Sequence, residues 1–164
     1  MNEKNVQRQH AEVQFAEELA VLLKTDSGEK PFGWQLSPRS VVDYLMGITL
    51  SNGFVVSPKY IGQRRLIEIA VATLATDRAL LLYGLPGTAK SWVSEHLAAA
   101  ISGDSTLLIQ GTAGVGEEAI RYGWNYARLL SEGPSFHALV STPLMRAMKE
   151  GKMVRVEELT RMAA

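Results

Sequence analysis

The spacing of apolar side chains predicts several helices in the first half of the chain. Between residues 6 and 24, apolar positions recur at intervals of three and four with charged residues between them. This period is typical of an amphipathic helix. Two further helices are expected at residues 37–46 and 58–76, because each follows a Ser-Pro pair that can cap a helix and begin its first turn.

Short apolar runs predict strands that alternate with helices along the rest of the chain. The strands are expected at residues 79–83, 106–110 and 153–156, after a short extended piece at 54–56. The helices are expected at residues 90–101, 117–130 and 141–151. Strands that alternate with helices favour an α/β fold with a parallel sheet.

The segment between the first of these strands and its helix has the composition of a phosphate-binding P-loop. Residues 84–91 read Gly-Leu-Pro-Gly-Thr-Ala-Lys-Ser. Small residues let backbone N–H groups surround phosphate oxygens, and the helix N-terminus adds about half a positive charge. Lys90 is expected to reach the β- and γ-phosphates of ATP, and the Ser91 hydroxyl to ligate Mg²⁺.

One position departs from the usual pattern, because Ala89 stands where that pattern has glycine. Alanine is the smallest substitute and is compatible with the start of a helix. The alternative is a Gly/Pro turn before an ordinary helix, but the Lys-Ser pair at the required offset favours the P-loop. The residues expected to bind nucleotide in this segment are Gly84, Leu85, Pro86, Gly87, Thr88, Ala89, Lys90, Ser91 and Trp92.

Two adjacent carboxylates follow the last expected strand. Glu157 is expected to hold the Mg²⁺ shell, and Glu158 to orient or deprotonate the attacking water. Two features run against this hypothesis: Asp is usual at the metal position, and Arg155 interrupts an otherwise apolar strand. Paired carboxylates after a short apolar run also occur at solvated helix starts, and the P-loop upstream favours the catalytic interpretation.

Composition narrows the class of protein further. The 17 basic and 17 acidic residues cancel, so nothing indicates a nucleic-acid or membrane-surface partner. The absence of cysteine excludes disulfides and thiolate metal sites. The polar N-terminus shows no signal peptide, and the apolar stretches fall short of the roughly 20 residues of a membrane helix, so a soluble cytoplasmic protein is expected.

The remaining aromatic and histidine residues show no pattern of their own that indicates chemistry. The three histidines, His10, His96 and His137, lack metal-ligand spacing and are expected to be solvated or packed. The alternating aromatics from Tyr122 to Tyr126 could stack bases. Without a basic patch, packing against the sheet or a neighbouring subunit is favoured.

With these residues in hand, the chain resembles the MoxR-type AAA+ ATPases. Residues 84–91 fit the P-loop variant Gly-x-Pro-Gly-x-Ala-Lys-[Ser/Thr] of that family, in which Ala89 is typical. Residues 110–112 and 133–134 resemble the Gln-x-Thr and Gly-Pro that surround its central strands, and residues 156–161 resemble its Asp-Glu-x-Asn-Arg segment. The resemblance covers about residues 58–164.

The resemblance also implies a second part of the nucleotide site. Residues 60–63 are similar to the family's Val-Gly-Gln segment, whose backbone and apolar side chains surround the adenine. Tyr60, Ile61 and Gly62 are therefore expected to contact the base. The implied fold is an incomplete AAA+ P-loop NTPase core at residues 54–164, a parallel sheet with flanking helices, preceded by a helical N-terminal extension at residues 1–53.

The function that the resemblance implies is Mg²⁺-dependent ATP hydrolysis in a homo-oligomeric ring, a hexamer, that remodels a protein partner. A neighbouring subunit would supply an arginine. The family's core continues beyond its catalytic strand, so the sequence is expected to be the N-terminal part of a longer protein, and the P-loop strand to lack both of its neighbours. The alternatives are a non-hydrolysing nucleotide-dependent interaction module, or inactive fragment, and a small-molecule kinase, which is disfavoured because no acceptor site is evident.

Overall fold

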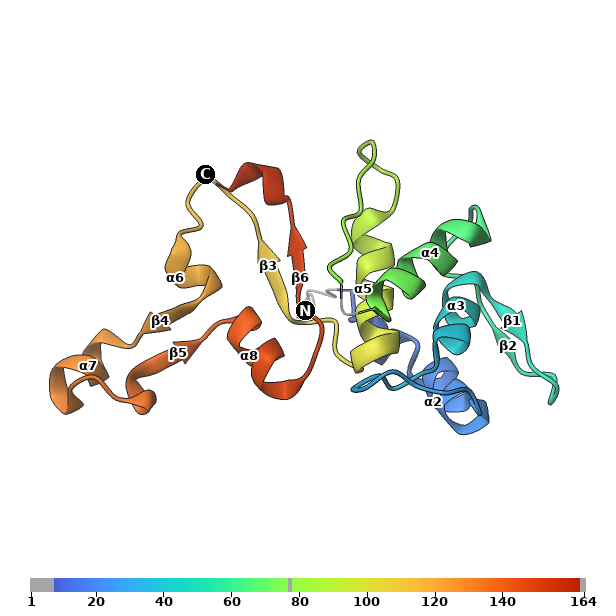
Figure 1. Ribbon diagram of the computed structural model, residues 1–164, viewed down its shortest axis with the longest axis horizontal. Helices are drawn as coiled ribbons and strands as arrows, with labels where there is room; N and C mark the ends of the chain where they lie inside the picture. The colour runs from blue at the N-terminus through green and yellow to red at the C-terminus, as the bar shows by residue number, and fades with distance from the viewer. Residues whose placement is uncertain (1–7, 77, 163–164) are drawn as a thin grey trace, which may run out of the picture. The chain divides into compact units, whose positions relative to one another are not determined.

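The computed structural model describes residues 8–76 and 78–162, and its contacts divide the chain into two compact units, Met1–Ser105 and Thr106–Ala164. The sequence-based division at residue 53 stays a prediction. The elements of the first unit, seen in Figure 1, are α1 (Ala11–Gln14), α2 (Ala16–Thr25), α3 (Pro38–Met46), β1 (Ile48–Thr49), β2 (Val55–Val56), α4 (Arg64–Leu74) and α5 (Lys90–Ser102).

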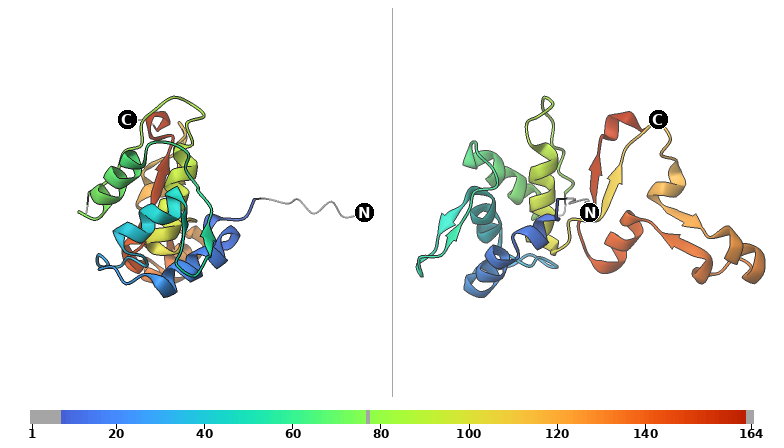
Figure 2. Two further views of the ribbon diagram at one scale, coloured as in Figure 1. Left: turned by 90° about the vertical axis from the view of Figure 1, so that its right-hand side faces the viewer. Right: turned by 180° about the vertical axis from the view of Figure 1, so that it is seen from behind.

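Helix α5 is the central element of the first unit. Helices α1 and α3 pack against it, and α3 also packs against α4, as the views in Figure 2 show. Every residue from Glu95 to Ser102 is buried, so this half of the helix has no solvent-exposed face. A helix that is buried all round is typical of a core position, and α5 therefore holds a fixed place in this unit.

Helix α3 confirms the prediction for residues 37–46. The Ser37 side chain accepts a hydrogen bond from the Ser40 amide at 3.3 Å, Pro38 occupies the first turn, and Gly47 ends the helix with a φ of 80°. Its buried face includes Tyr44 and Leu45, each fully inaccessible to solvent. The Ser-Pro pair therefore caps and begins this helix, as predicted from the sequence.

Two other helices were predicted with the wrong boundaries. The helix expected at 6–24 is interrupted at Phe15, whose φ of −115° and ψ of 28° separate α1 from α2, and residues 6 and 7 lie outside the described residues. The helix expected from residue 58 begins only at Arg64. The residues before Arg64 are held outside a helix by contacts with other elements. The Ser57 hydroxyl donates to Glu18, and the Lys59 amide donates to the Leu45 carbonyl.

The strand expected at residues 79–83 is not formed. This segment belongs to the long loop that precedes α5 in Figure 1, and in the described part of the chain it pairs with no strand. Leu81 and Tyr83 are 76% and 96% exposed. An apolar run becomes a strand only when another strand satisfies its backbone groups, and none of the described strands does so here.

The second unit contains shorter elements. They are β3 (Leu108–Gln110), α6 (Glu117–Ile120), β4 (Tyr122–Trp124), α7 (Tyr126–Glu132), the 3₁₀ helix η1 (Phe136–Ala138), β5 (Leu139–Ser141), α8 (Pro143–Glu150), β6 (Arg155–Glu157) and the 3₁₀ helix η2 (Leu159–Arg161). Strands β3 and β6 pair in parallel and place Gln110 opposite Glu157. Of the expected parallel sheet, the described residues form this one pair.

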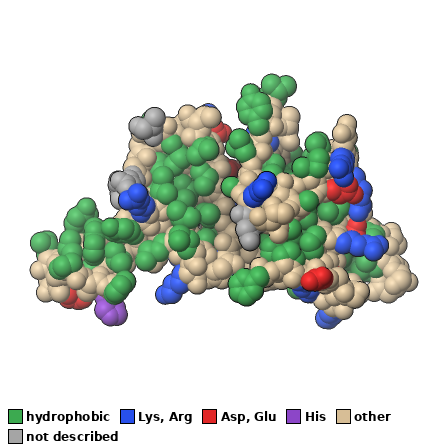
Figure 3. All heavy atoms as spheres, in the orientation of Figure 1, with side chains coloured by type: hydrophobic (Ala, Val, Ile, Leu, Met, Phe, Trp, Pro, Cys, Tyr) green, Lys and Arg blue, Asp and Glu red, His purple; other side chains and the backbone are tan. Residues whose placement is uncertain are grey.

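The helix expected at residues 117–130 is also wrong. Strand β4 lies between α6 and α7 and pairs antiparallel with β5, with Tyr122 opposite Ser141. Tyr122 and Trp124 alternate with period two, which is the strand periodicity. Figure 3 shows hydrophobic side chains at the surface of this hairpin, where Leu130 and Phe136 are 88% and 87% exposed.

The C-terminal part of the unit confirms two predictions. The Thr142 side chain caps α8 by accepting from the Met145 amide at 3.2 Å, and Gly151 ends the helix in a left-handed conformation. Strand β6 follows within two residues of its expected position. The Gly133-Pro134 pair lies between α7 and η1, before this helix and strand.

Candidate functional site

The loop before α5 has the left-handed backbone that a P-loop turn requires. Gly87 has a φ of 81°, and Ala89, at the N-cap of α5, has a φ of 59° and a ψ of 23°. The left-handed region disfavours residues with a Cβ by about 1–2 kcal/mol. Ala89 is therefore tolerated with backbone strain, rather than simply compatible with a helix start.

Lys90 lies across its own loop. Its ammonium group donates to the carbonyl oxygens of Gly84 and Leu85 at 3.1 and 2.8 Å and lies 3.4 Å from the Thr88 hydroxyl. The Thr88 hydroxyl in turn donates to the Leu85 carbonyl at 2.8 Å. These contacts direct the loop carbonyls toward the lysine, and place a cation within the turn.

The N-terminus of α5 carries no side-chain cap. Ser37, Asn125 and Thr142 each accept a hydrogen bond from the first turn of their helix, whereas Ala89 has no side-chain acceptor to offer α5. The first turn of a helix has amide donors without intrahelical partners and a partial positive charge. Together with Lys90, this end of α5 is suited to an anion such as a phosphate group.

A cavity of about 530 Å³ adjoins this loop within the first unit. It is lined by Lys59, Tyr60, Ile61, Gly87, Thr88, Ala89 and Trp92. The structure thus brings two segments that sequence analysis assigned to nucleotide binding to one cavity. The other assigned residues do not line this cavity: Gly62, Gly84, Leu85 and Pro86 lie in the same loops, and Lys90 and Ser91 begin α5.

The segment at 58–62 is held in place by the end of α3. The amides of Lys59 and Tyr60 both donate to the Leu45 carbonyl, at 2.8 and 2.9 Å. A Cβ at Gly47 would lie 2.9 Å from the Pro58 nitrogen, and a Cβ at Gly62 would overlap the Tyr60 ring. Glycine at position 47 lets Pro58 lie against the end of α3, and glycine at position 62 leaves room for the Tyr60 ring.

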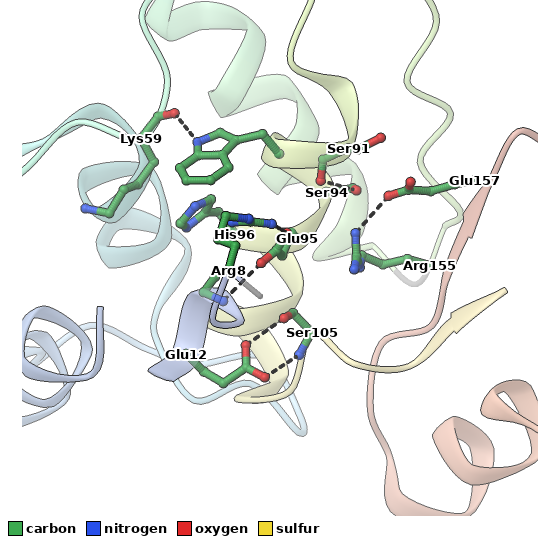
Figure 4. Close-up of polar contacts among 12 residues, drawn as sticks. Arg8, Glu12, Lys59, Ser91, Ser94, Glu95, His96, Ser105, Arg155 and Glu157 are labelled. Carbon is green, nitrogen blue, oxygen red and sulfur yellow. Dashed lines mark hydrogen bonds and ion pairs between the residues drawn. The ribbon is translucent and has the colours of Figure 1, made fainter. Parts of the chain in front are cut away.

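Lys59 is a cavity residue that sequence analysis missed. Its carbonyl oxygen accepts a hydrogen bond from the Trp92 indole N–H at 2.7 Å, which Figure 4 shows. Its side chain is 1% exposed and forms an ion pair with Glu18. Burial lowers the Lys59 pKa, while the Glu18 carboxylate acts in the opposite direction. A surface lysine was the default expectation, and no local pattern in the sequence indicated burial.

Behind Trp92 lies a buried group of rings. The His96 ring centre is 4.4 Å from that of Trp92, and His96 Nδ1 lies 2.9 Å from the Tyr44 hydroxyl. Burial lowers the His96 pKa to about 4 and raises that of Tyr44. His96 Nε2 is buried without a hydrogen-bond partner in the described structure. Of the two states expected for the histidines, solvated or packed, His96 is packed.

The predicted carboxylates belong to the second unit. Glu157 ends β6, and its Oε1 accepts from the buried Arg155 guanidinium at 2.8 Å. Glu158 has a φ of 54° and a ψ of 39°, in the left-handed region. The Gly111 amide donates to the Glu157 carbonyl at 2.8 Å, and a Cβ at Gly111 would lie 2.9 Å from that oxygen and nearer still to the Glu158 carbonyl.

The residues present fit a nucleotide better than they indicate a preformed metal site. The cavity, the Lys90 ammonium and the uncapped helix end supply apolar, cationic and amide-donor groups that suit a nucleoside triphosphate. Within residues 8–76 and 78–162, no group of three or more His, Asp or Glu side chains could hold a metal ion. Ser91 and Glu157 supply oxygen donors of the kind that Mg²⁺ accepts alongside phosphate oxygens.

A glycine-containing loop with left-handed turns, followed by a buried helix that begins Lys-Ser, is typical of the P-loop nucleoside triphosphatases. A model of the AAA domain family, dynein-related subfamily, matches residues 79–164. The chain belongs to this AAA family.

Comparison with known proteins adds one named relative. The Uncharacterized protein YehL of Escherichia coli (strain K12) is 48% identical over 157 residues, which is 96% of this chain and 42% of that protein. The chain therefore spans less than half the length of that relative. No solved structure matches the chain. None of the helices described here has the length and apolar character needed to cross a membrane.

Proposed function

We propose that this protein binds ATP in the cavity beside the P-loop and hydrolyses it in the manner of the MoxR-type AAA+ ATPases. The observation that carries the proposal is the convergence of residues 59–61, residues 87–89 and Trp92 on one cavity next to Lys90. A base in the part lined by Tyr60, Ile61 and Trp92 would place the phosphates toward the loop and the start of α5.

Each residue has a distinct part in the proposed reaction. The loop amides and Lys90 neutralise charge on the phosphates. Ser91 and Glu157 would hold Mg²⁺, which supplies further charge neutralisation on the phosphate oxygens when bound. Glu158, directly after β6, orients and deprotonates the attacking water.

The proposal extends to the assembly in which the protein works. We propose a homo-oligomeric ring, a hexamer, that remodels a protein partner in the cytoplasm and receives an arginine from a neighbouring subunit. Family membership and the resemblance at residues 156–161 support this arrangement. The balance of 17 basic and 17 acidic residues gives no indication of a nucleic-acid or membrane-surface partner.

ATP binding is tested by substituting Lys90. We expect Lys90→Ala to weaken ATP binding by about 100-fold, because hydrogen bonds to charged groups contribute about 1.5–3 kcal/mol each. Isothermal titration of the wild-type and variant chains measures the change. Lys24→Ala, which removes an exposed lysine of α2, is the matched control and should bind ATP normally. An unchanged affinity in Lys90→Ala would refute the P-loop assignment.

Hydrolysis is tested by substituting Glu158 in the assembled ring. Glu158→Gln keeps the size of the side chain and removes its basicity. We expect it to retain ATP and to lower phosphate release by about 100-fold or more, the usual contribution of a general base. Normal turnover in this variant would move the base to another residue.

A second candidate function is a nucleotide-dependent interaction module that binds ATP without hydrolysing it. The ion pair between Glu157 and the buried Arg155 favours it, because this pair engages one oxygen of the carboxylate assigned to the metal. Phosphate release from the assembled wild-type protein separates the two functions. Measurable release that depends on Glu158 supports hydrolysis, and ATP binding without release supports the module.

A further inference from the structure

The N-terminal segment contacts Trp92, which is one of the residues that line the cavity. Phe15, at the break between α1 and α2, places its ring edge-on to Trp92, with ring centres 6.4 Å apart and an interplanar angle of 87°. The Arg8 guanidinium lies 4.8 Å from the centre of the Trp92 ring. Trp92 is thus contacted from the N-terminal segment at two points.

Lys59 is held by the same helices. Its ammonium pairs with Glu18 of α2, lies 4.3 Å from the centre of the Phe15 ring and also donates to the Ser57 carbonyl. The Lys59 side chain is 1% exposed and its charge lies against Glu18 and the Phe15 ring, while Lys59 is also one of the residues that line the cavity. The hydrogen bond from the Trp92 indole to the Lys59 carbonyl joins the two wall residues to each other.

The anchoring of α1 explains why these contacts hold a fixed position. Glu12 accepts from the amide and hydroxyl of Ser105, and the Ala11 amide donates to Glu95 of α5 at 3.0 Å. Figure 4 shows Glu12 with Ser105, and Glu95 with Arg8. Helix α1 is therefore fastened to the start of the buried half of α5 and to Ser105, just past the end of that helix, and Phe15 and Glu18 contact the cavity residues Trp92 and Lys59.

We propose that helices α1 and α2 form part of the nucleotide site, with Phe15 and Glu18 as positioning residues that hold Trp92 and Lys59 against the base of the nucleotide. The inference rests on the proposed function. It assigns the N-terminal helices to recognition of the base, and leaves the phosphates to residues 84–91. Loss of Phe15 or Glu18 should therefore weaken binding of a ligand that has a base and spare one that has only phosphates.

The experiment compares ATP with inorganic tripolyphosphate on the full chain by isothermal titration. We expect Phe15→Leu and Glu18→Gln to weaken ATP binding by about fivefold to tenfold, the value of one aromatic or buried polar contact, and to leave tripolyphosphate binding unchanged. Phe15→Tyr keeps the ring and should restore wild-type ATP affinity. Glu17→Gln, an exposed neighbour on α2, is the control.

The outcomes separate this inference from the function on which it rests. If the wild-type chain binds neither ligand, the proposed nucleotide site itself is wrong. If the wild type binds both, the inference is overturned either by unchanged ATP affinity in the variants or by equal losses for ATP and tripolyphosphate. Circular dichroism verifies that each variant is folded. If Glu18→Gln unfolds because Lys59 loses its counter-charge, the comparison of Phe15→Leu with Phe15→Tyr tests the inference.

Discussion

The two units each place a left-handed residue with a side chain at their candidate functional segment, but they hold it differently. Among the described residues, Ala89 and Glu158 are the two with positive φ that are not glycine. Ala89 lies in an exposed loop whose carbonyls are held by Lys90, one residue away. Glu158 follows a strand whose end is packed against Gly111, far away in the sequence.

The P-loop turn is therefore stabilised by its neighbours in the sequence, whereas the turn at Glu158 depends on residues that are distant in the sequence. The side-chain hydrogen bonds of Thr88 and Lys90 that hold the P-loop all lie within residues 84–90, so a short motif carries these contacts. The turn that presents Glu158 exists only when β6 pairs with β3 and Gly111 leaves room for its backbone. Backbone strain of this kind is often found at functional sites and persists only where surrounding structure enforces it.

The largest expected effect is a loss of stability in the second unit, with the first unit unchanged. In Gly111→Ala, the new Cβ would meet two backbone oxygens that cannot move without losing the pairing of β3 and β6. We expect unfolding of this unit to become easier by about 3 kcal/mol, the upper range for overpacking. Peptide-resolved hydrogen exchange should show faster exchange at 106–162, with ATP binding in the first unit retained.

Gly114→Ala is the matched control for this substitution. A Cβ at Gly114 would meet no atom within 4 Å, so exchange should match that of the wild type. Equal behaviour of the two variants would mean that Gly111 does not limit the approach of the Glu157–Glu158 backbone.

The next largest effect is a loss of stability in the first unit as the pH falls. The His96 pKa of about 4 lies below its usual value of 6.5 because of burial. Between these values the unfolded chain binds more protons than the folded one, so stability is fully present above pH 6.5 and is lost as the pH falls. The loss between pH 7 and pH 5 should be about 2 kcal/mol, measured by urea unfolding.

His96→Gln distinguishes this residue from other groups that titrate. Glutamine cannot be protonated in this range and retains an acceptor for the Tyr44 hydroxyl. The variant should therefore lose most of the dependence on pH between 7 and 5. A pH dependence that is identical in the variant would contradict the assignment of the effect to His96.

The features that sequence predicted correctly are those encoded by neighbouring residues. Short motifs indicated the Ser37 cap of α3, the helix that begins after Thr142 and the strand before Glu158. The break at Phe15 was not predictable in this way, because the apolar period continues across it. The ring leaves the helix pattern to pack against Trp92, which is a contact across 77 positions of the chain.

Tertiary contacts also explain the other failures. Burial of Lys59 depends on Glu18, and the delayed start of α4 depends on Leu45, so neither could be read from the local sequence. The strand at 122–124 was detectable, because its aromatics alternate with period two, but helix-forming neighbours on both sides obscured it. Propensity and period are weak evidence where distant residues decide the backbone.

The smallest expected effect compares the two strained residues directly. Glycine takes the left-handed conformation without a Cβ penalty, although it also adds entropy to the unfolded chain. In Ala89→Gly we expect a gain of about 0.5 kcal/mol in the free energy of unfolding, with ATP affinity unchanged, because the loop needs only the conformation. Glu158→Gly should gain less, since it also loses the ion pair with Arg161 at 3.0 Å, and it should stop hydrolysis. Urea unfolding and phosphate release measure the two quantities, and a destabilised Ala89→Gly would contradict the left-handed turn at the start of α5.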